Sequence, residues 1–165
     1  MSRNNAPAPT GGAWLPPISV LVVDDQAAVR EGLARLITCA PITLRTIASA
    51  ASGAEALRTA AWLHPAVVVL DADLAGEDGL ALIPGFAPAA VLVLTCHGDA
   101  ATRKRAARLG AMAFVEKHQP AAELLGAVVH LATLQMRGEL APTRPGAGSH
   151  VAAVACSDVP GLVRP

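Results

Sequence analysis

The chain has 165 residues and no net formal charge, because 13 basic residues balance 13 acidic ones. This length fits a single domain that can bury a core of its own. Apolar residues make up 53% of the sequence and aromatic residues only 2%. This composition and neutral charge argue against a chain that binds DNA by itself. The three cysteines show no CxxC spacing, so neither a disulfide framework nor a zinc knuckle is expected.

Apolar stretches in the chain are too short for membrane insertion. The longest, such as residues 89–94, hold six residues, whereas a spanning helix needs about 20. The first ten residues contain no apolar segment of the signal-peptide type. We therefore expect a cytoplasmic protein that does not insert into a membrane.

Proline and glycine divide the chain into three parts. Residues 1–17 and 141–165 are rich in both, and we expect a disordered N-terminal arm and a flexible tail there. The segment 18–140 carries nearly all of the periodic apolar pattern, so we predict that it is the folded domain.

Five short aliphatic runs recur in this segment. They are residues 18–23, 42–48, 66–70, 90–94 and 112–115. Val, Ile and Leu follow one another in these runs without strict alternation, which is typical of strands buried on both faces of a parallel sheet.

Helical patterns separate the runs. Helical spacing or capping residues mark the segments 29–37, 52–64, 99–110 and 120–138. Ser52 and Asp99 are the candidate N-caps, and residues 79–83 give at most a short helix before Pro84. The alternation predicts an α/β fold of the (βα)5 type. It has an open, parallel, five-stranded sheet with right-handed crossovers and helices on both faces.

Polar residues follow four of the runs. Asp24 and Asp25 follow the first run, Asp71 the third, Thr95 the fourth and Lys117 the fifth. Ligands of open α/β sheets bind beyond the carboxyl ends of the strands, so these side chains are predicted to converge. A lone Asp after a strand is most often a turn former or helix cap. The prediction therefore depends on the joint pattern.

The residue types in this pattern favour phosphoryl chemistry with a metal ion. Three carboxylates at one sheet edge raise one another's pKa unless a cation lies among them. Oxygen ligands of this kind suit Mg²⁺, which also binds water and phosphate oxygens. A Thr hydroxyl and a Lys ammonium would donate hydrogen bonds to a phosphoryl group beside the metal. Asp71 would then be the nucleophile that forms an acyl phosphate.

Four stretches of the chain resemble the receiver domain of two-component response regulators. They are VLVVDDQAAVREGL, VVVLDADLAGEDGL, VLVLTCHGD and LGAMAFVEK. The resemblance runs in order over residues 18–138. It implies a flavodoxin-like (βα)5 fold and an Asp that accepts a phosphoryl group, with Mg²⁺ bound, from a histidine kinase or phosphotransfer protein.

The resemblance also implies roles for the acidic residues. Asp71 is the phosphoacceptor, and Asp25 and Asp71 are metal ligands. Asp24 acts mainly through water, and Asp73 supplies a backbone carbonyl to the metal.

Further roles fall on the later strand ends. By the same resemblance, Thr95 follows the phosphoryl group, Lys117 pairs with it, and Phe114 is the aromatic switch residue. The positions of Asp73 and His97 flank the path of the hydrolytic water. We expect these two residues to tune the lifetime of the acyl phosphate, although both could instead be solvated loop residues.

Two features leave alternatives open. Many receiver domains have Pro-Gly where this chain has Ala75 and Gly76, which is expected to loosen the loop without removing chemistry. The predicted fourth helix carries a basic patch that is either a solvated face or a partner contact. Its residues are Arg103, Lys104, Arg105 and Arg108.

The leading hypothesis is a stand-alone receiver that signals through contacts with a downstream protein effector and is not a metabolic enzyme. Only 27 residues follow Gly138, too few for a three-helix DNA-binding domain. One alternative is a haloacid-dehalogenase-type phosphatase, because VVVLDADLAG resembles the DxD motif of that family. In that family, however, the motif follows the first strand, and Ala75 stands where Thr or Val is expected. Another alternative is the remnant of a transcription regulator that has lost its DNA-binding domain.

Overall fold

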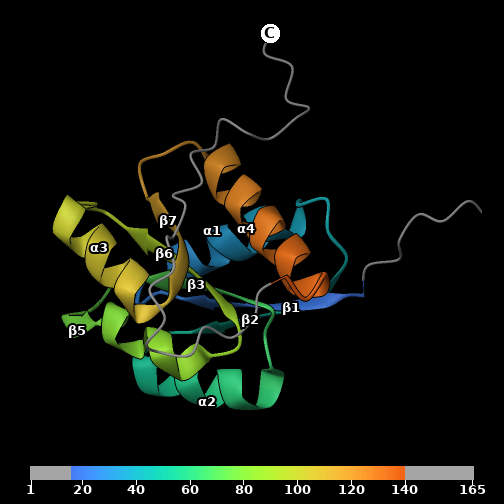
Figure 1. Ribbon diagram of the computed structural model, residues 1–165, viewed down its shortest axis with the longest axis horizontal. Coiled ribbons are helices and arrows are strands. Elements are labelled where there is room, and N and C mark those ends of the chain that lie inside the picture. The colour runs from blue at the N-terminus through green and yellow to red at the C-terminus, as the bar shows by residue number, and fades with distance from the viewer. Residues whose placement is uncertain (1–15, 140–165) are drawn as a thin grey trace, which may run out of the picture.

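The computed structural model describes residues 16–139 of the chain. Most of the predicted N-terminal arm and all of the predicted tail lie outside these residues. Within them the chain forms one sheet covered by helices and a short separate hairpin (Figure 1).

The main sheet has five parallel strands in the order β2-β1-β3-β6-β7. The strands are β1 (Ile18–Val23), β2 (Leu44–Ala50), β3 (Val67–Asp71), β6 (Ala90–Thr95) and β7 (Ala111–Glu116). This is the flavodoxin-like order, in which the chain reverses direction across the sheet between β1 and β3. The predicted fold class is confirmed.

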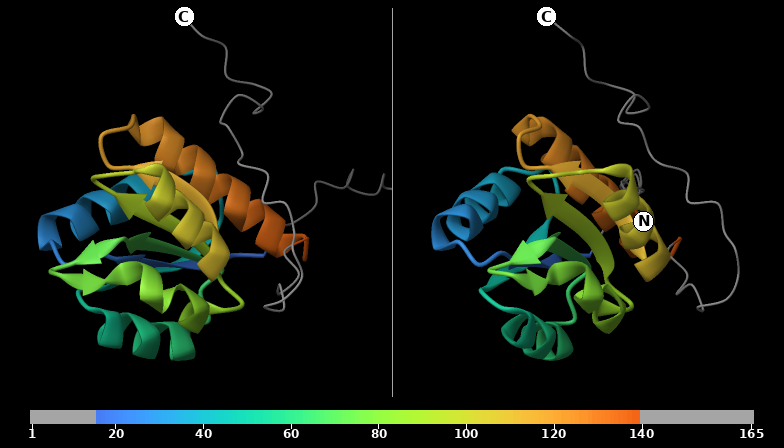
Figure 2. Two further views of the ribbon diagram at one scale, coloured as in Figure 1. Left: turned by 60° about the vertical axis from the view of Figure 1, so that its left-hand side comes forward. Right: turned by 90° about the vertical axis from the view of Figure 1, so that its left-hand side faces the viewer.

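Helices cover both faces of the sheet (Figure 2). The helices are α1 (Ala27–Thr38), α2 (Gly53–Leu63), η1 (Gly79–Phe86), α3 (Ala100–Leu109) and α4 (Ala121–Met136). Helices α1 and α4 pack on one face, whereas α2, α3 and the 3₁₀ helix η1 pack on the other. The short helix expected near residues 79–83 is this 3₁₀ segment, which contains Pro84.

Two aliphatic layers form the core because the central strands are buried on both sides. Along β1, Leu21 and Val23 pack toward α2, while Val20 and Val22 pack toward α1 and α4. Each of these four side chains is at most 1% exposed. Alternating side chains of a strand point to opposite faces, so burial on both faces requires an unbroken aliphatic run rather than an alternating one.

The edge strand β2 differs from the prediction. Its run was expected at residues 42–48 and to be buried on both faces, but β2 spans Leu44–Ala50 and exposes Arg45 and Thr46. The strand extends further because β1 pairs with it as far as Val23 and Ala50. As the last strand of the sheet it has a neighbour on one side only, so it is less buried than the central strands.

Local capping residues position the helix starts as predicted. The Ser52 hydroxyl accepts a hydrogen bond from the backbone N–H of Glu55 at 3.4 Å, and Asp99 accepts one from Thr102 at 2.6 Å. The Glu55 carboxylate in turn accepts from the backbone N–H of Ala51 at 2.8 Å. The first of these bonds satisfies a backbone donor that the first turn of α2 leaves free, and the bond from Ala51 holds the residue before the N-cap.

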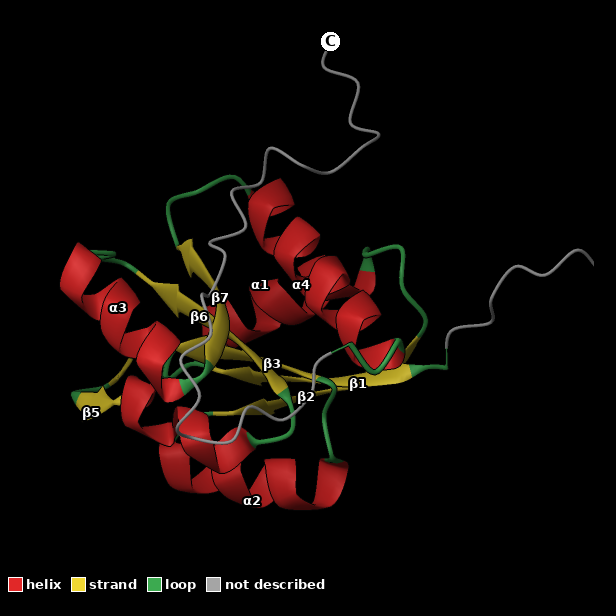
Figure 3. Ribbon diagram, viewed as in Figure 1, coloured by secondary structure: helices red, strands yellow, loops and turns green. Residues whose placement is uncertain are grey.

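A hairpin directly after β3 was not predicted. Strands β4 (Asp73–Leu74) and β5 (Glu77–Asp78) pair antiparallel around Ala75 and Gly76 (Figure 3). Both turn residues have positive φ, 54° and 86°, as in two-residue hairpin turns. Proline holds φ near −65°, so it could not occupy the position of Ala75 in this turn. The segment is therefore a closed hairpin rather than the looser loop that was expected.

Carboxylates of the hairpin tie it to two helices. The Glu77 carboxylate accepts a hydrogen bond from the backbone N–H of Gly53, the first residue of α2, at 3.1 Å. Asp78 forms a two-point ion pair with Arg105 of α3. The segment that follows the phosphoacceptor candidate is thus anchored to both α2 and α3.

Gly79 lies so close to β3 that no side chain fits. A Cβ atom at this position would overlap the carbonyl oxygen of Asp71 and lie 3.0 Å from that of Ala72. The backbone N–H of Gly79 donates to the same Ala72 oxygen at 2.9 Å. Because the obstructing atoms belong to the backbone, a larger residue could be accommodated only if β3 or η1 moved.

We predict opposite stability effects for alanine at two glycines. Gly79→Ala should lower the free energy of unfolding by about 1–3 kcal/mol, because the backbone beside Asp71 must shift. Gly32→Ala should raise it by about 0.5–1 kcal/mol, since Gly32 lies in an exposed part of α1 with no atom within 4 Å of the added Cβ. Urea unfolding measures both values. Wild-type stability in Gly79→Ala would contradict the close approach.

Candidate functional site

Three carboxylates meet at the carboxyl ends of β1 and β3. Oxygen atoms of Asp24, Asp25 and Asp71 all lie within 4.8 Å of one another. Asp24 is fully buried, Asp71 is 5% exposed and Asp25 is half-buried. Strands β1 and β3 are hydrogen-bonded neighbours, so their ends lie side by side. The structure brings these three residues together as predicted.

Lys117 joins the cluster from the end of β7. Its ammonium group contacts Asp24 Oδ2 at 2.8 Å and Asp71 Oδ2 at 2.6 Å. Burial lowers the pKa of Lys117, but the hydrogen bonds and charges of these two carboxylates outweigh it, and the net shift is upward. Lys117 is therefore a stable cation between two buried anions.

The pKa of Asp71 is raised above its ordinary value. Burial of the carboxyl is the largest cause, and the negative charge of Asp24 adds to it. Hydrogen bonds from Lys117 and from the backbone N–H of Asp73, which lies 3.2 Å from Oδ1, oppose the rise. The Asp71 carboxylate is thus poorly solvated.

Thr95 lies at the end of β6, but its hydroxyl is bound within its own loop. Thr95 Oγ1 donates to the carbonyl of His97 and accepts from the N–H of His97, both at 3.2 Å. Within residues 16–139 no hydrogen bond joins Thr95 to Asp71. The His97 residue is exposed. For the Thr95 hydroxyl to donate to a group on Asp71, its hydrogen bond to the His97 carbonyl would have to break.

The carboxylate of Asp73 points into the hairpin turn. Asp73 Oδ1 accepts a hydrogen bond from the backbone N–H of Gly76 at 2.8 Å, and the residue is exposed. Its side chain is outside the three-carboxylate cluster. Only its backbone N–H, through the bond to Asp71, touches the cluster.

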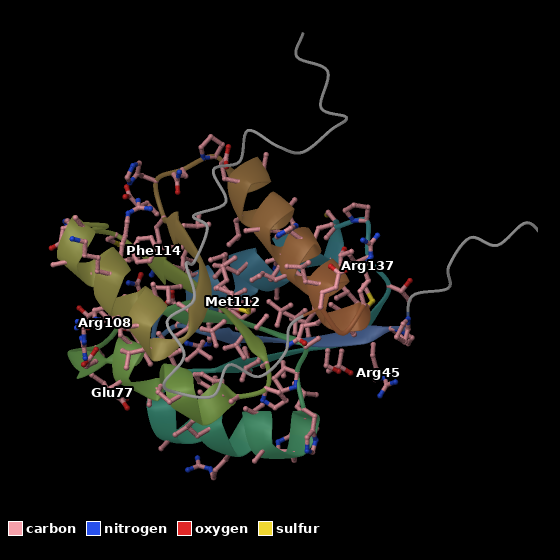
Figure 4. The ribbon with its side chains drawn as sticks, in the orientation of Figure 1. Arg45, Glu77, Arg108, Met112, Phe114 and Arg137 are labelled. Carbon is pink, nitrogen blue, oxygen red and sulfur yellow. The ribbon has the colours of Figure 1, made fainter. Side chains whose placement is uncertain are left out.

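Phe114 lies half-buried on β7, two residues along the strand from the exposed Met112 (Figure 4). The guanidinium of Arg103 lies over its ring, 4.6 Å from the centroid. The same guanidinium forms an ion pair with Glu116 at 2.6 Å. Phe114 also packs against the core on the α2 side of the sheet.

The basic patch on α3 is partly neutralised. Arg103 pairs with Glu116, and Arg105 pairs with Asp78. The sequence left a solvated face and a partner contact open as alternatives. It gave no sign that half of the patch binds acidic residues from other elements.

Sequence reasoning missed one residue that contacts the acidic turn. The Arg30 guanidinium, from α1, donates to the backbone carbonyl of Asp24 at 2.7 Å and to that of Asp25 at 2.9 Å. The sequence contains no recognisable signal for this contact, because a single arginine on a helix is usually solvated.

Comparison with known proteins decides the family. Residues 20–129 match the response regulator receiver domain family. This chain belongs to that family.

Relatives of this receiver domain include longer proteins. It is 35% identical to a protein-glutamate methylesterase/protein-glutamine glutaminase of Anaeromyxobacter dehalogenans, over 78% of this chain and 43% of that protein. It is also 35% identical to the transcriptional regulatory protein LnrK of Bacillus subtilis, over 68% of this chain and 52% of that protein. The receiver domain therefore spans about half the length of these curated relatives or less.

Solved structures agree with the fold. The signal receiver domain of the response regulator NarL from Mycobacterium tuberculosis superposes with a TM-score of 0.63 at 28% identity, covering 71% of this chain and 97% of that one. The chemotaxis protein CheY4 of Vibrio cholerae superposes with a TM-score of 0.63 at 20% identity, covering 70% of this chain and 99% of that one. None of the helices between residues 16 and 139 has the length and apolarity needed to cross a membrane.

The raised pKa of Asp71 predicts a pH-dependent stability in the metal-free receiver. The folded state holds the Asp71 proton more tightly than the unfolded state, whose pKa is near the ordinary 3.8. This contribution is fully present below that value and is lost as the pH rises through the raised pKa. Asp71→Asn removes the titration, so its stability relative to wild type should increase from pH 4 to pH 7.

Asp78 provides a control, because its pKa is shifted in the opposite direction from that of Asp71. The pKa of Asp78 is lowered by its hydrogen bonds from Arg105, so this carboxylate stabilises the fold above its unfolded pKa. Asp78→Asn should therefore lose stability relative to wild type as the pH rises. Urea unfolding in EDTA at pH 4, 5.5 and 7 measures both trends. A pH-independent difference for Asp71→Asn would contradict the assigned shift.

Proposed function

We propose that this receiver domain accepts a phosphoryl group on Asp71, with Mg²⁺ bound, from a histidine kinase or a phosphotransfer protein. It then signals through contacts with a downstream protein effector. The observation that carries the proposal is the Lys117 ammonium, which bridges the buried Asp24 and Asp71 beside a third carboxylate.

The donor set at this site fits Mg²⁺. The three side chains of the cluster offer carboxylate oxygens, which are ligands that Mg²⁺ takes in proteins together with water and phosphate oxygens. Asp25 and Asp71 would hold the ion directly, Asp24 mainly through water, and Asp73 through its backbone carbonyl. When bound, Mg²⁺ neutralises charge between the carboxylates and the incoming phosphoryl group.

In the proposed reaction, an oxygen of the ionised Asp71 carboxylate attacks phosphorus. A new P–O bond forms, the P–N bond to the donor imidazole breaks, and the electron pair stays on the imidazole nitrogen. Lys117 already lies 2.6 Å from Asp71 Oδ2 and would move its hydrogen bond to the phosphoryl oxygens. Such charge-assisted bonds are strong in a buried site.

Thr95 and Phe114 are the proposed route from phosphorylation to the surface. The Thr95 hydroxyl would leave its two hydrogen bonds to His97 and bind the phosphoryl group. Phe114 is the proposed switch residue, because its ring lies partly exposed under Arg103. A shift of the loop after Thr95 would change the surroundings of that ring.

A phosphatase of the haloacid-dehalogenase type is the weaker alternative. That activity needs a second Asp, two positions after the nucleophile, as a general acid and base. Here the Asp73 carboxylate is bound to the backbone of Gly76 in the hairpin and lies outside the acidic cluster. A remnant of a transcription regulator would share the phosphoacceptor site and differ only in its output.

Phosphorylation of Asp71 is tested with a small donor. We expect acetyl phosphate and Mg²⁺ to add the mass of one phosphoryl group, labile to hydroxylamine, to wild type. Asp71→Asn, or wild type in EDTA, should gain none. Asp78→Asn, a change outside the cluster, is the matched control and should still be modified. Intact-protein mass spectrometry provides the measurement. Equal labelling of Asp71→Asn would overturn the assignment, and rapid turnover of p-nitrophenyl phosphate would favour a phosphatase.

The lifetime of the acyl phosphate is proposed to depend on Asp73 and His97. Both residues are exposed and could orient the hydrolytic water. After removal of the donor, we expect Asp73→Ala and His97→Ala to change the decay rate by more than about twofold, or ~0.4 kcal/mol in barrier. Decay of both variants within that factor of wild type would show that these residues do not control the lifetime.

A further inference from the structure

Arg30 fixes the turn that carries two of the three carboxylates. A single guanidinium nitrogen, Nη1, donates to the carbonyl oxygens of Asp24 at 2.7 Å and Asp25 at 2.9 Å. Arg30 lies on the second turn of α1 and is half-buried. It therefore closes a loop of the chain between the end of β1 and the start of α1.

Asp24 and Asp25 are held in different ways. The Asp24 N–H donates to Ala50 on β2 at 3.2 Å, and its carboxylate binds both Lys117 and the N–H of Gln26. Within residues 16–139, by contrast, no hydrogen bond or ion pair holds the Asp25 carboxylate. The direction of the Asp25 side chain therefore follows from its backbone, and Arg30 is the side chain that binds its carbonyl oxygen.

The N-cap side chain of α1 adds no hydrogen bond to the turn. Gln26 is the N-cap of α1, and its side chain makes no capping hydrogen bond. Arg30, from the same helix, instead binds two carbonyl groups of the turn.

We infer that Arg30 is a positioning residue that holds the Asp25 carboxylate toward the metal site. This inference rests on the proposed function and assigns a role in Mg²⁺ binding to a residue outside the acidic cluster. Arg30 leaves all the carboxylate oxygens free, because it binds carbonyl groups only. Lys117, by contrast, occupies oxygens of Asp24 and Asp71.

Charge and position predict opposite effects when Arg30 is removed. The guanidinium is a cation beside a proposed cation site, so its charge alone weakens Mg²⁺ binding, and its removal would strengthen it. If Arg30 instead orients Asp25, its removal must weaken binding. Loss of an outer contact that orients a ligand typically costs 10–100-fold in metal affinity. The sign of the change therefore separates the two effects.

The experiment is a titration of the apo protein with Mg²⁺ alone, followed by the amide NMR signals of the acidic turn. Arg30→Met keeps the aliphatic stem and removes the donors, and we expect its Mg²⁺ affinity to fall about tenfold. Arg35→Met, an exposed arginine on the same helix, is the matched control and should bind as wild type does. Unchanged or tighter binding in Arg30→Met would overturn the inference.

Three further variants keep the test decisive. Asp25→Asn should weaken binding, and adding Arg30→Met to it should cost little more, because Arg30 acts through Asp25. If the losses of Mg²⁺ affinity in the two single variants add fully in the double variant, Arg30 does not act through Asp25. If Arg30→Met does not fold, Arg30→Lys decides, since it keeps the charge while its ammonium nitrogen is one bond nearer the backbone than Nη1. Wild-type Mg²⁺ affinity in Arg30→Lys would then overturn the inference.

Phosphorylation by acetyl phosphate separates this inference from the proposed function. If wild type is labelled on Asp71 and Arg30→Met needs more Mg²⁺ for half-maximal labelling, both stand. If wild type is labelled, and Arg30→Met and Arg35→Met need the same Mg²⁺ concentration as wild type for labelling, only the role of Arg30 fails. If wild type binds Mg²⁺ but Asp71 is never labelled, the proposed function fails, while the binding titration still tests Arg30.

Discussion

The site depends on one electrostatic constraint, which is that two buried carboxylates need a positive partner. Asp24 is fully buried and Asp71 nearly so, and an unpaired charge in such surroundings is costly. The Lys117 ammonium contacts both at 2.8 and 2.6 Å. Without it, repulsion and burial would favour protonation of one carboxyl, and a protonated Asp71 could not attack phosphorus.

The sheet brings this partner within reach. Strands β1 and β3 are neighbours, and β6 and β7 follow on the same side, so all four carboxyl ends open at one edge. The backbone N–H of Lys117 donates to the carbonyl of Thr95 at 2.7 Å, which fixes the lysine relative to β6. The aliphatic runs therefore do more than fill the core, because their register sets the distances between the charged groups.

The segment after Asp71 is constrained on several sides. Gly79 packs against the Asp71 carbonyl, Glu77 binds the start of α2, and Asp78 pairs with Arg105 of α3. A change in charge at Asp71 would therefore occur close to the contacts that join this segment to α2 and α3. On the other side of the site, the Thr95 hydroxyl is hydrogen-bonded within the β6–α3 loop.

Much of this protein could be predicted from its sequence, because the deciding physics is local. Unbroken aliphatic runs require burial on two faces, which predicted the parallel sheet. The caps at Ser52 and Asp99 follow from hydrogen bonds within a few residues of each other. Strand ends in a parallel sheet share one edge, so the convergence of Asp24, Asp25 and Asp71 was predictable from their positions alone.

Tertiary structure decided the contacts that join distant segments. Lys117 reaches Asp24 across 93 positions of the chain, and its pairing with two carboxylates at once depends on strand register. The tight hairpin at Ala75, the ion pairs of the basic patch and the hold of Arg30 on the acidic turn left no periodic or spacing signal. Each depends on where a side chain lies in three dimensions, because one charged or small residue looks the same in sequence whether it is solvated or packed.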